Sequence, residues 1–279
     1  MNATPSMPNG WTAERKLFPH QVGFTCPPHD WDAAPSDFLP IAPPSVGVHG
    51  RMLHLPDYAH RLDQRRGNLA LLEEFVHCMA NNGADVCAQV GSNWVHASGL
   101  GVAGIRDWCT RLEERHGVPL HMAGYALVEA LREMNVERVA LNAVYHWPDW
   151  WRGTVAFLEE AGFEVVWAGN FVDQGWFPDQ EAVNARRWIF DAELAERSFR
   201  HVAERAPRVD AYLANGMCNF RTGADGQPER LLHLTPRLEA MLGVPVIAHD
   251  TALYWRVFKT LGLRPEGAEG RHGRLLASL

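Results

Sequence analysis

The 279-residue sequence has few cysteines, no CxxC pair and no long apolar run. Five thiols scattered through a long chain, without the spacing of a zinc ribbon, are typical of a reduced cytoplasmic protein. No stretch approaches the roughly 18 apolar residues that span a bilayer. The first residues contain neither the basic segment nor the apolar stretch of a secretory signal. We therefore expect a cytoplasmic protein that does not act at a membrane.

Positive charge is also scarce, because 26 Lys and Arg face 33 Asp and Glu, giving a net charge of −7. Nucleic acids and anionic membranes are bound by clustered basic residues, so we expect neither as a partner. Hydrophobic residues make up 47% of the chain and charged residues 21%, as in a folded protein. At about 150 residues per domain, the length predicts one large or two medium domains.

Short apolar runs alternate with segments of helical periodicity from residue 22 onwards, after an arm (residues 1–20) that we expect to be loose. The predicted strands are 22–26, 85–90, 139–143, 164–168, 210–215 and 244–248. The predicted helices lie near 68–82, 102–115, 124–134, 150–161, 179–205, 229–242 and 250–261. This alternation predicts parallel sheets with helices on both faces.

The chain also contains an internal repeat. Three segments recur in the same order at offsets of 117 to 126 residues: 22–29 with 139–146, 83–91 with 208–216, and RLEERHGVP (111–119) with RLEAMLGVP (237–245). Blocks that recur in one order predict a duplicated fold. We expect one half to comprise residues 1–118 plus 247–279, and the other to comprise residues 119–246.

The repeat indicates where a ligand would bind, because open parallel sheets bind ligands beyond the carboxyl ends of their strands. Three pairs of segments are expected at these ends: 27–29 with 144–146, 91–93 with 216–218, and 122–124 with 248–250. Two halves that face each other would line one cleft from both sides. Such a site suits chemistry on a small planar intermediate.

At these residues the sequence resembles the aspartate/glutamate racemase superfamily, most closely the branch of arylmalonate decarboxylase and maleate cis-trans isomerase. The motifs cover about residues 20–275: VGxxxPP (22–28), GADV with a GSN loop (83–93), GVP before a helix (117–131), RVALxxxY (138–145), FLEEAGFEV (157–165), GVPV with ALYW (243–255) and HGRLL (272–276). The resemblance implies an α/β fold of two pseudo-symmetric Rossmann-like halves, each a parallel four-stranded sheet flanked by helices. It also implies an active site in the cleft between them and cofactor-free chemistry beside a carboxylate.

The sequence departs from the pattern of this family at the two catalytic cysteine positions. Racemases and isomerases of this type use a cysteine from each half, whereas the decarboxylase has glycine first and keeps the second cysteine. Here Gly91 stands at the first position, and the second falls on Gly216 or Met217, just before Cys218. Two-cysteine racemization is therefore disfavoured, and a single-cysteine mechanism requires Cys218 at the catalytic place.

Other candidates carry hydrogen-bond donors at the strand ends. By position, Ser92 and Asn93 match the oxyanion-binding Thr-Ser pair of the family, and Tyr145 matches its carboxylate-binding tyrosine. Such donors stabilise an enediolate. Ser and Asn are also common in turns and at helix N-caps, which would explain Ser92 and Asn93 without a functional role. This alternative does not explain Tyr145, because capping does not require tyrosine. The expected substrate-binding set is completed by Pro28, Gly91, Gly216, Met217 and His249.

His29 and His146 are related by the repeat, and an imidazole exchanges a proton near neutral pH. We predict Cys218, His146 and His29 as catalytic, while the two histidines also fit exposed loops or carboxylate recognition. His29, His146 and His249 allow a metal-site alternative, which no HxxxH or HxD spacing supports. The tryptophans at 147, 150 and 151 fit a wall for an aromatic substrate, a helix-packing surface or a subunit contact.

The sequence thus predicts a cofactor-independent decarboxylase that acts on a small malonate-like dicarboxylic acid through an enediolate. No metal and no cofactor are expected, the expected partner is a small carboxylic acid, and a homo-oligomer is compatible with the sequence. The alternatives are an isomerase or racemase with non-cysteine acid/base residues and a metal-dependent hydrolase or lyase. A non-catalytic module that binds a small carboxylate is a further alternative.

Overall fold

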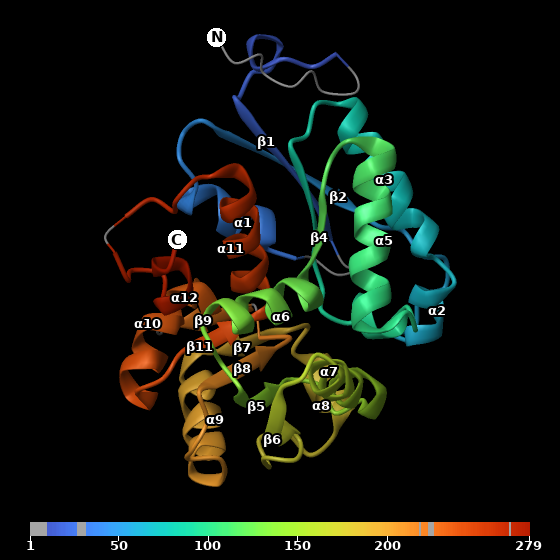
Figure 1. The fold of residues 1–279 in the computed structure, drawn as a ribbon. Helices are drawn as coiled ribbons and strands as arrows, with labels where there is room; N and C mark the ends of the chain where they lie inside the picture. The colour runs from blue at the N-terminus through green and yellow to red at the C-terminus, as the bar shows by residue number, and fades with distance from the viewer. Residues whose placement is uncertain (1–9, 27–31, 218, 223–225, 268) are drawn as a thin grey trace.

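The computed structural model describes residues 10–26, 32–217, 219–222, 226–267 and 269–279. Two four-stranded parallel sheets form the centres of two halves, one in the upper and one in the lower part of Figure 1. The first sheet contains β1 (His20–Cys26), β2 (Val46–Met52), β3 (Val86–Gln89) and β4 (Leu120–Met122). The second contains β5 (Arg138–Ala143), β6 (Glu164–Asn170), β8 (Ala211–Asn215) and β11 (Val246–Ala248).

The two sheets have the same topology. The strand order is β2-β1-β3-β4 in the first and β6-β5-β8-β11 in the second, and all pairings within both are parallel. The predicted fold class, with two parallel four-stranded sheets flanked by helices, is confirmed.

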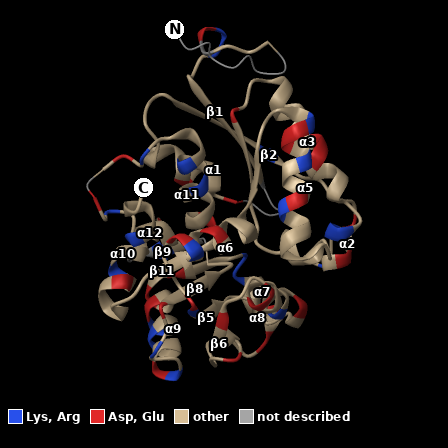
Figure 2. Cartoon of the chain, in the orientation of Figure 1, with Lys and Arg blue, Asp and Glu red and all other residues tan. Residues whose placement is uncertain are grey.

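Helices flank both sheets. They are α1 (Ala34–Phe38), α2 (Leu62–Arg66), α3 (Leu69–Asn81), α4 (Trp94–Ala97), α5 (Gly101–His116), α6 (Ala123–Glu133), α7 (Pro148–Glu160), α8 (Gln180–Ala185), α9 (Ala192–Arg205), α10 (Leu231–Leu242), α11 (His249–Leu261) and α12 (Arg274–Ala277). A small third sheet contains β7 (Ile189–Asp191), β9 (Asn219–Thr222) and β10 (Gln227–Arg230). Acidic and basic residues are mixed along outer helices such as α5 and α9 (Figure 2). No helix among the described residues is long and apolar enough to cross a bilayer.

The RLE…GVP repeat has the same structure in both halves. It ends α5 at Gly117 and α10 at Gly243, which have φ of 70° and 79°. Glycine adopts this left-handed conformation without the steric penalty of a side chain, so the chain leaves each helix sharply. The strands that follow are β4 and β11, and the helices after them, α6 and α11, pack against each other (Figure 1).

The chain passes between the sheets slightly later than the predicted limits at residues 118 and 246. Leu120–Met122 still pairs with β3 of the first sheet, and Val246–Ala248 pairs with β8 of the second. After β11 the chain packs as α11 against β3 and β4. β4 and β11 thus end after the predicted limits at residues 118 and 246, respectively.

Residues 10–20 are held against the first half, where the sequence predicts part of a loose arm. The Trp11 indole donates to the carbonyl of Asn81 at 3.0 Å. The Lys16 ammonium lies 2.6 Å from a carboxylate oxygen of Asp85, and the Lys16 side chain is buried. Because a buried ammonium needs a partner of opposite charge, this ion pair attaches the segment before β1.

The single helix predicted over 179–205 is wrong. Arg187 and Trp188 have left-handed φ of 48° and 60°, and the short strand β7 follows them before α9 begins. Non-glycine residues rarely adopt this conformation, so periodicity alone did not reveal the break. β2 is also absent from the predicted strands, because only Val46 and Val48 of its residues carry large apolar side chains on the buried face.

Candidate functional site

Four buried polar side chains from both halves meet beyond the carboxyl ends of β3, β5 and β8. Ser92 and Asn93 lie in the loop between β3 and α4, Tyr145 follows β5, and Asn215 is the last residue of β8. None of the four is more than 7% exposed. We call these residues the hydroxyl–amide cluster. Three of them were predicted from the sequence, and Asn215 was not.

Two hydroxyl groups converge on one amide oxygen in this cluster. Asn215 Oδ1 accepts hydrogen bonds from the Tyr145 hydroxyl at 2.5 Å and from Ser92 Oγ at 2.9 Å. The same hydroxyls lie 3.4 and 3.1 Å from Asn93 Oδ1. Each hydroxyl has a single hydrogen to donate. Because Asn215 Oδ1 is the nearer acceptor for both hydroxyls, both hydrogens are donated to it. Ser92 of the first half and Tyr145 of the second are thereby joined.

The amide of Asn215 is held in one orientation. Its Nδ2 donates to Thr154 Oγ1 at 3.1 Å, and the Thr154 hydroxyl donates to the carbonyl of Trp150 at 3.2 Å. Because the Thr154 hydrogen is used in this way, its oxygen acts as an acceptor and requires the NH₂ group of Asn215. The carbonyl oxygen of the amide therefore faces Ser92 and Tyr145.

The two glycines expected at the cysteine positions both have a left-handed backbone. The φ angle is 93° at Gly91 and 78° at Gly216. A Cβ atom on Gly216 would lie 2.6 Å from Cε1 of the Tyr145 ring, so Tyr145 occupies the space of any side chain at residue 216. Met217 is buried in the core of the second half. Cys218, Pro28 and His29 lie outside the described residues.

His146 directly follows Tyr145 in the sequence, but its ring contacts residues outside the hydroxyl–amide cluster. Its Nδ1 is 3.2 Å from a carboxylate oxygen of Asp173 and 3.3 Å from Asn170 Oδ1, beyond the end of β6. The side chain is 46% exposed. An Asp partner fixes the orientation of an imidazole, an arrangement used by acid/base histidines. The sequence did not single out Asp173, because it lies in a turn whose side chains carry no motif.

His249, the first residue of α11, is buried and held by one backbone bond. Its Nδ1 lies 3.2 Å from the carbonyl oxygen of Ala214, an acceptor, so this nitrogen carries the hydrogen. Burial lowers the pKa of His249 to about 4. Burial also lowers the pKa of His96 to about 3, with further effects of Arg65 and His249. Both imidazoles are therefore neutral at pH 7.

Aromatic rings from both halves pack around Tyr145. The rings of Trp150, Trp188 and Trp147 have centroids 4.9, 6.0 and 6.4 Å from that of Tyr145. His60 of the first half stacks on Trp147 at 5.1 Å, and its carbonyl accepts from the Trp150 indole at 2.9 Å. Of the three tryptophans singled out in the sequence, Trp147 and Trp150 thus lie next to Tyr145.

Arg65, which the sequence did not reveal, is buried beside the same rings. Its guanidinium lies 4.7 Å from the ring centre of Trp150, and it donates to the Tyr58 hydroxyl at 2.7 Å. A buried guanidinium adds positive charge next to the aromatic rings. Within the described ranges, no three His, Cys, Asp or Glu side chains are grouped to hold a metal ion.

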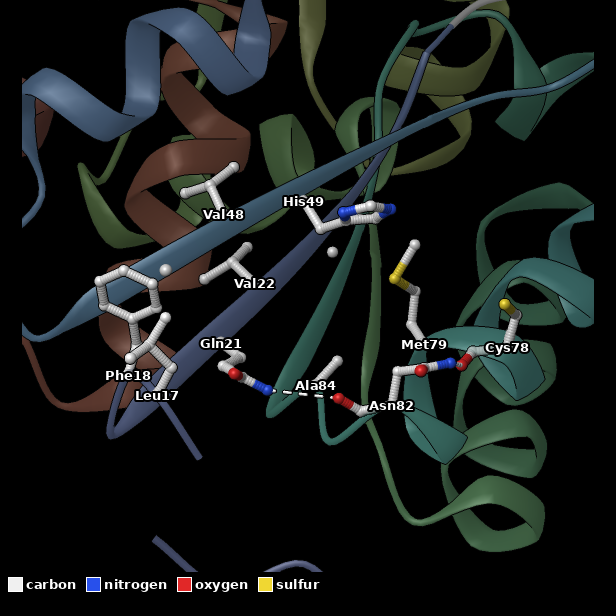
Figure 3. A pocket seen from close by; sticks show the side chains of 12 residues that line it. Leu17, Phe18, Gln21, Val22, Val48, His49, Cys78, Met79, Asn82 and Ala84 are labelled. Atoms are coloured by element: carbon white, nitrogen blue, oxygen red, sulfur yellow. Dashed lines mark hydrogen bonds between the residues drawn. The ribbon is translucent and has the colours of Figure 1, made fainter. Parts of the chain in front are cut away.

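A separate cavity of about 400 Å³ lies near the amino ends of β1 and β2, between these strands and α3 (Figure 3). Leu17, Phe18, Val22, Val48 and Met79 contribute most of its apolar lining. Because the hydroxyl–amide cluster lies at the carboxyl ends of the strands, this cavity is not part of the candidate site.

A sequence model of the arylmalonate decarboxylase family matches residues 69–276. A crystal structure of arylmalonate decarboxylase is similar to the chain with a TM-score of 0.68 at 22% identity, over 92% of this chain and 98% of that one. Maleate isomerase Iso from Pseudomonas putida S16 gives a TM-score of 0.70 at 16% identity, with the same coverage. The Nocardia farcinica maleate cis-trans isomerase gives 0.65 at 19%, again over 92% and 98%. These structures share the fold, and no curated protein matches the chain.

Replacing Gly216 with alanine tests whether Tyr145 fills the neighbouring space. Gly216→Ala places a methyl group against the Tyr145 ring at a left-handed φ of 78°, whereas Gly243→Ala has φ of 79° and no atom within 4 Å. We expect Gly243→Ala to lower the free energy of unfolding by about 1–2 kcal/mol. Gly216→Ala should lower it by about 1–3 kcal/mol more, from overpacking. Equal losses in urea denaturation would show that Tyr145 does not occupy this space.

The lowered pKa of His249 predicts acid-sensitive stability. The unfolded chain binds a proton at its usual pKa of 6.5, whereas the folded protein does so only near 4. The free energy of unfolding is therefore not reduced by His249 above pH 6.5, and it falls as the pH drops toward 4. His249→Asn, which keeps a donor for the Ala214 carbonyl, should reduce the loss of unfolding free energy between pH 7 and pH 5 by about 2 kcal/mol. Parallel losses for both proteins in urea denaturation contradict this expectation.

Proposed function

The chain belongs to the arylmalonate decarboxylase family, and on this basis we propose that it decarboxylates a small malonate-like dicarboxylic acid through an enediolate, without a cofactor. Membership of this family makes it an enzyme of the decarboxylase or maleate isomerase kind. The proposal assigns it to the decarboxylases. The observation that carries this choice is the hydroxyl–amide cluster beside Gly91, which stands at the first cysteine position as glycine does in the decarboxylase.

The hydroxyl–amide cluster supplies what an enediolate needs. Loss of CO₂ leaves negative charge on the two oxygens of the remaining carboxylate. The hydroxyls of Ser92 and Tyr145 are neutral donors that are nearly closed to solvent. Fixed donors in a site of low dielectric stabilise developing charge more than water does, because they need no reorganisation during the reaction. Backbone amides near Gly216 are further donors in this proposal.

The aromatic rings around Tyr145 support departure of CO₂. The carboxylate that leaves is charged, whereas CO₂ is neutral. An apolar wall such as that formed by Trp147 and Trp188 disfavours the charged ground state relative to the neutral product. The third ring, Trp150, carries the Arg65 guanidinium at 4.7 Å and so adds a positive charge beside this wall.

A proton must then reach the carbon that lost CO₂. Cys218, His146 and His29 are the proposed donors, and of these His146 is the one whose ring is oriented by a described contact, with Asp173. The same contact favours isomerization or racemization by histidine as the second candidate function. In that case the enzyme exchanges the α-hydrogen for deuterium without releasing CO₂.

The Tyr145 hydroxyl is the sharpest test of the proposed function. Tyr145→Phe removes one of the two hydroxyls on Asn215 Oδ1 and should lower kcat/KM for phenylmalonate decarboxylation about 100-fold to 1000-fold. Release of CO₂ measures the rate. Tyr212→Phe is the matched control, since this buried hydroxyl bonds to the carbonyl of Ala206 in the second half. Unchanged kcat/KM in Tyr145→Phe would refute the role of the cluster.

Two further variants test the proton donor. Because the donor acts in protonation of the carbon, Cys218→Ala or His146→Ala should reduce decarboxylation at least about 100-fold. The reduction should appear in kcat, measured by CO₂ release under saturating phenylmalonate. Full activity in both variants contradicts the assignment of these two residues.

A further inference from the structure

The unligated hydroxyl–amide cluster already contains an oxygen at the point where its two hydroxyls converge. Asn215 Oδ1 receives the hydrogens of Tyr145 and Ser92 at 2.5 and 2.9 Å. The same two hydroxyls are the donors that the proposed function assigns to a substrate carboxylate. A carboxylate oxygen and Asn215 Oδ1 therefore compete for the same two hydrogens, because each hydroxyl has only one.

Asn215 cannot avoid this competition by turning its amide. Rotation by 180° would present the NH₂ group to the hydroxyls and the amide oxygen to Thr154 Oγ1. The Thr154 hydrogen already goes to the carbonyl of Trp150, so two acceptors would then face each other. Asn215 is fully buried, and a lost hydrogen bond is not replaced there by bulk water.

We propose that Asn215 is a positioning residue, whose side-chain oxygen holds the hydroxyls of Ser92 and Tyr145 until a ligand acceptor, most readily a negatively charged carboxylate, displaces it. The inference rests on the proposed function, since it takes the cluster as the carboxylate site. It adds a cost of displacement that is the same for every ligand of these two hydroxyls. An uncharged amide or ester of the same shape gains less from the hydroxyls and binds weakly against this cost.

The physical basis is the difference between neutral and charge-assisted hydrogen bonds. A ligand carbonyl that replaces Asn215 Oδ1 exchanges one neutral acceptor for another, and the hydroxyls gain nothing. A carboxylate oxygen accepts bonds that are roughly twice as strong as neutral ones. Only the charged ligand therefore gains enough to offset the two bonds that Asn215 loses.

Phenylacetate and phenylacetamide are suitable probes, because they have the same shape, differ in charge at pH 7 and cannot lose CO₂ from a malonate group. Calorimetric titration of the wild type should show at least about 30-fold tighter binding of phenylacetate. In Asn215→Ala the hydroxyls keep only the longer contacts to Asn93 Oδ1, so both probes should bind about tenfold more tightly. The gain is common to both, because each probe displaces the same acceptor.

Asn142→Ala is the matched control. Asn142 is an equally buried asparagine of β5, and it bonds to Ser198 Oγ at 2.7 Å and to the Gln174 amide at 2.8 Å, away from the two hydroxyls. Its loss should lower the Tm of the protein as Asn215→Ala does, and it should leave both dissociation constants at the wild-type values. A purely structural role of Asn215 predicts that neither variant binds the probes more tightly.

Three results overturn the proposal or its basis. An Asn215→Ala protein that binds neither probe more tightly than the wild type overturns the inference and leaves the proposed function standing. A wild type that binds neither probe overturns the proposed function together with the inference.

If Asn215→Ala does not fold, Thr154→Val replaces it: this variant keeps Asn215 but frees its amide to turn. Unchanged dissociation constants in Thr154→Val then overturn the inference, and tighter binding of both probes supports it.

Discussion

One amide oxygen receives hydrogen bonds from both halves of this molecule, and the rest of the candidate site is arranged around that point. Asn215 Oδ1 accepts from Ser92 in the first half and from Tyr145 in the second. The strand ends that carry these residues must therefore come together. A buried hydroxyl without an acceptor is unfavourable, so the two halves are coupled through this one atom.

The duplicated topology explains how the strand ends meet. Both sheets have the same strand order, and both turn sharply at a left-handed glycine after an inner strand, at Gly91 and Gly216. The duplication is not exact in chemistry. At Gly216 the Tyr145 ring fills the space of a side chain. Neutral hydroxyl and amide groups make the contacts between the strand ends of the two halves.

Burial determines the charge of the groups nearby. His249 and His96 have pKa values well below neutrality because their environment excludes water, whereas the half-exposed His146 has the Asp173 carboxylate beside it. The donors within the cluster are neutral hydroxyls, and His146 lies outside the hydrogen bonds of the cluster. This separation fits a reaction in which one set of residues stabilises charge and another moves a proton.

The sequence alone determined the α/β class and the duplication, because strand periodicity, helix-ending glycines and repeated segments are local patterns. Three of the four cluster residues were predicted because the sequence resembles a known family at these positions. It did not reveal Asn215, Asp173, Arg65 or the ring of Trp188, since each acts through contacts between segments far apart in the chain. Periodicity also missed the break at Arg187 and Trp188. Which acceptor each hydroxyl finds depends on distances between strand ends, and only the packed tertiary structure decides those distances.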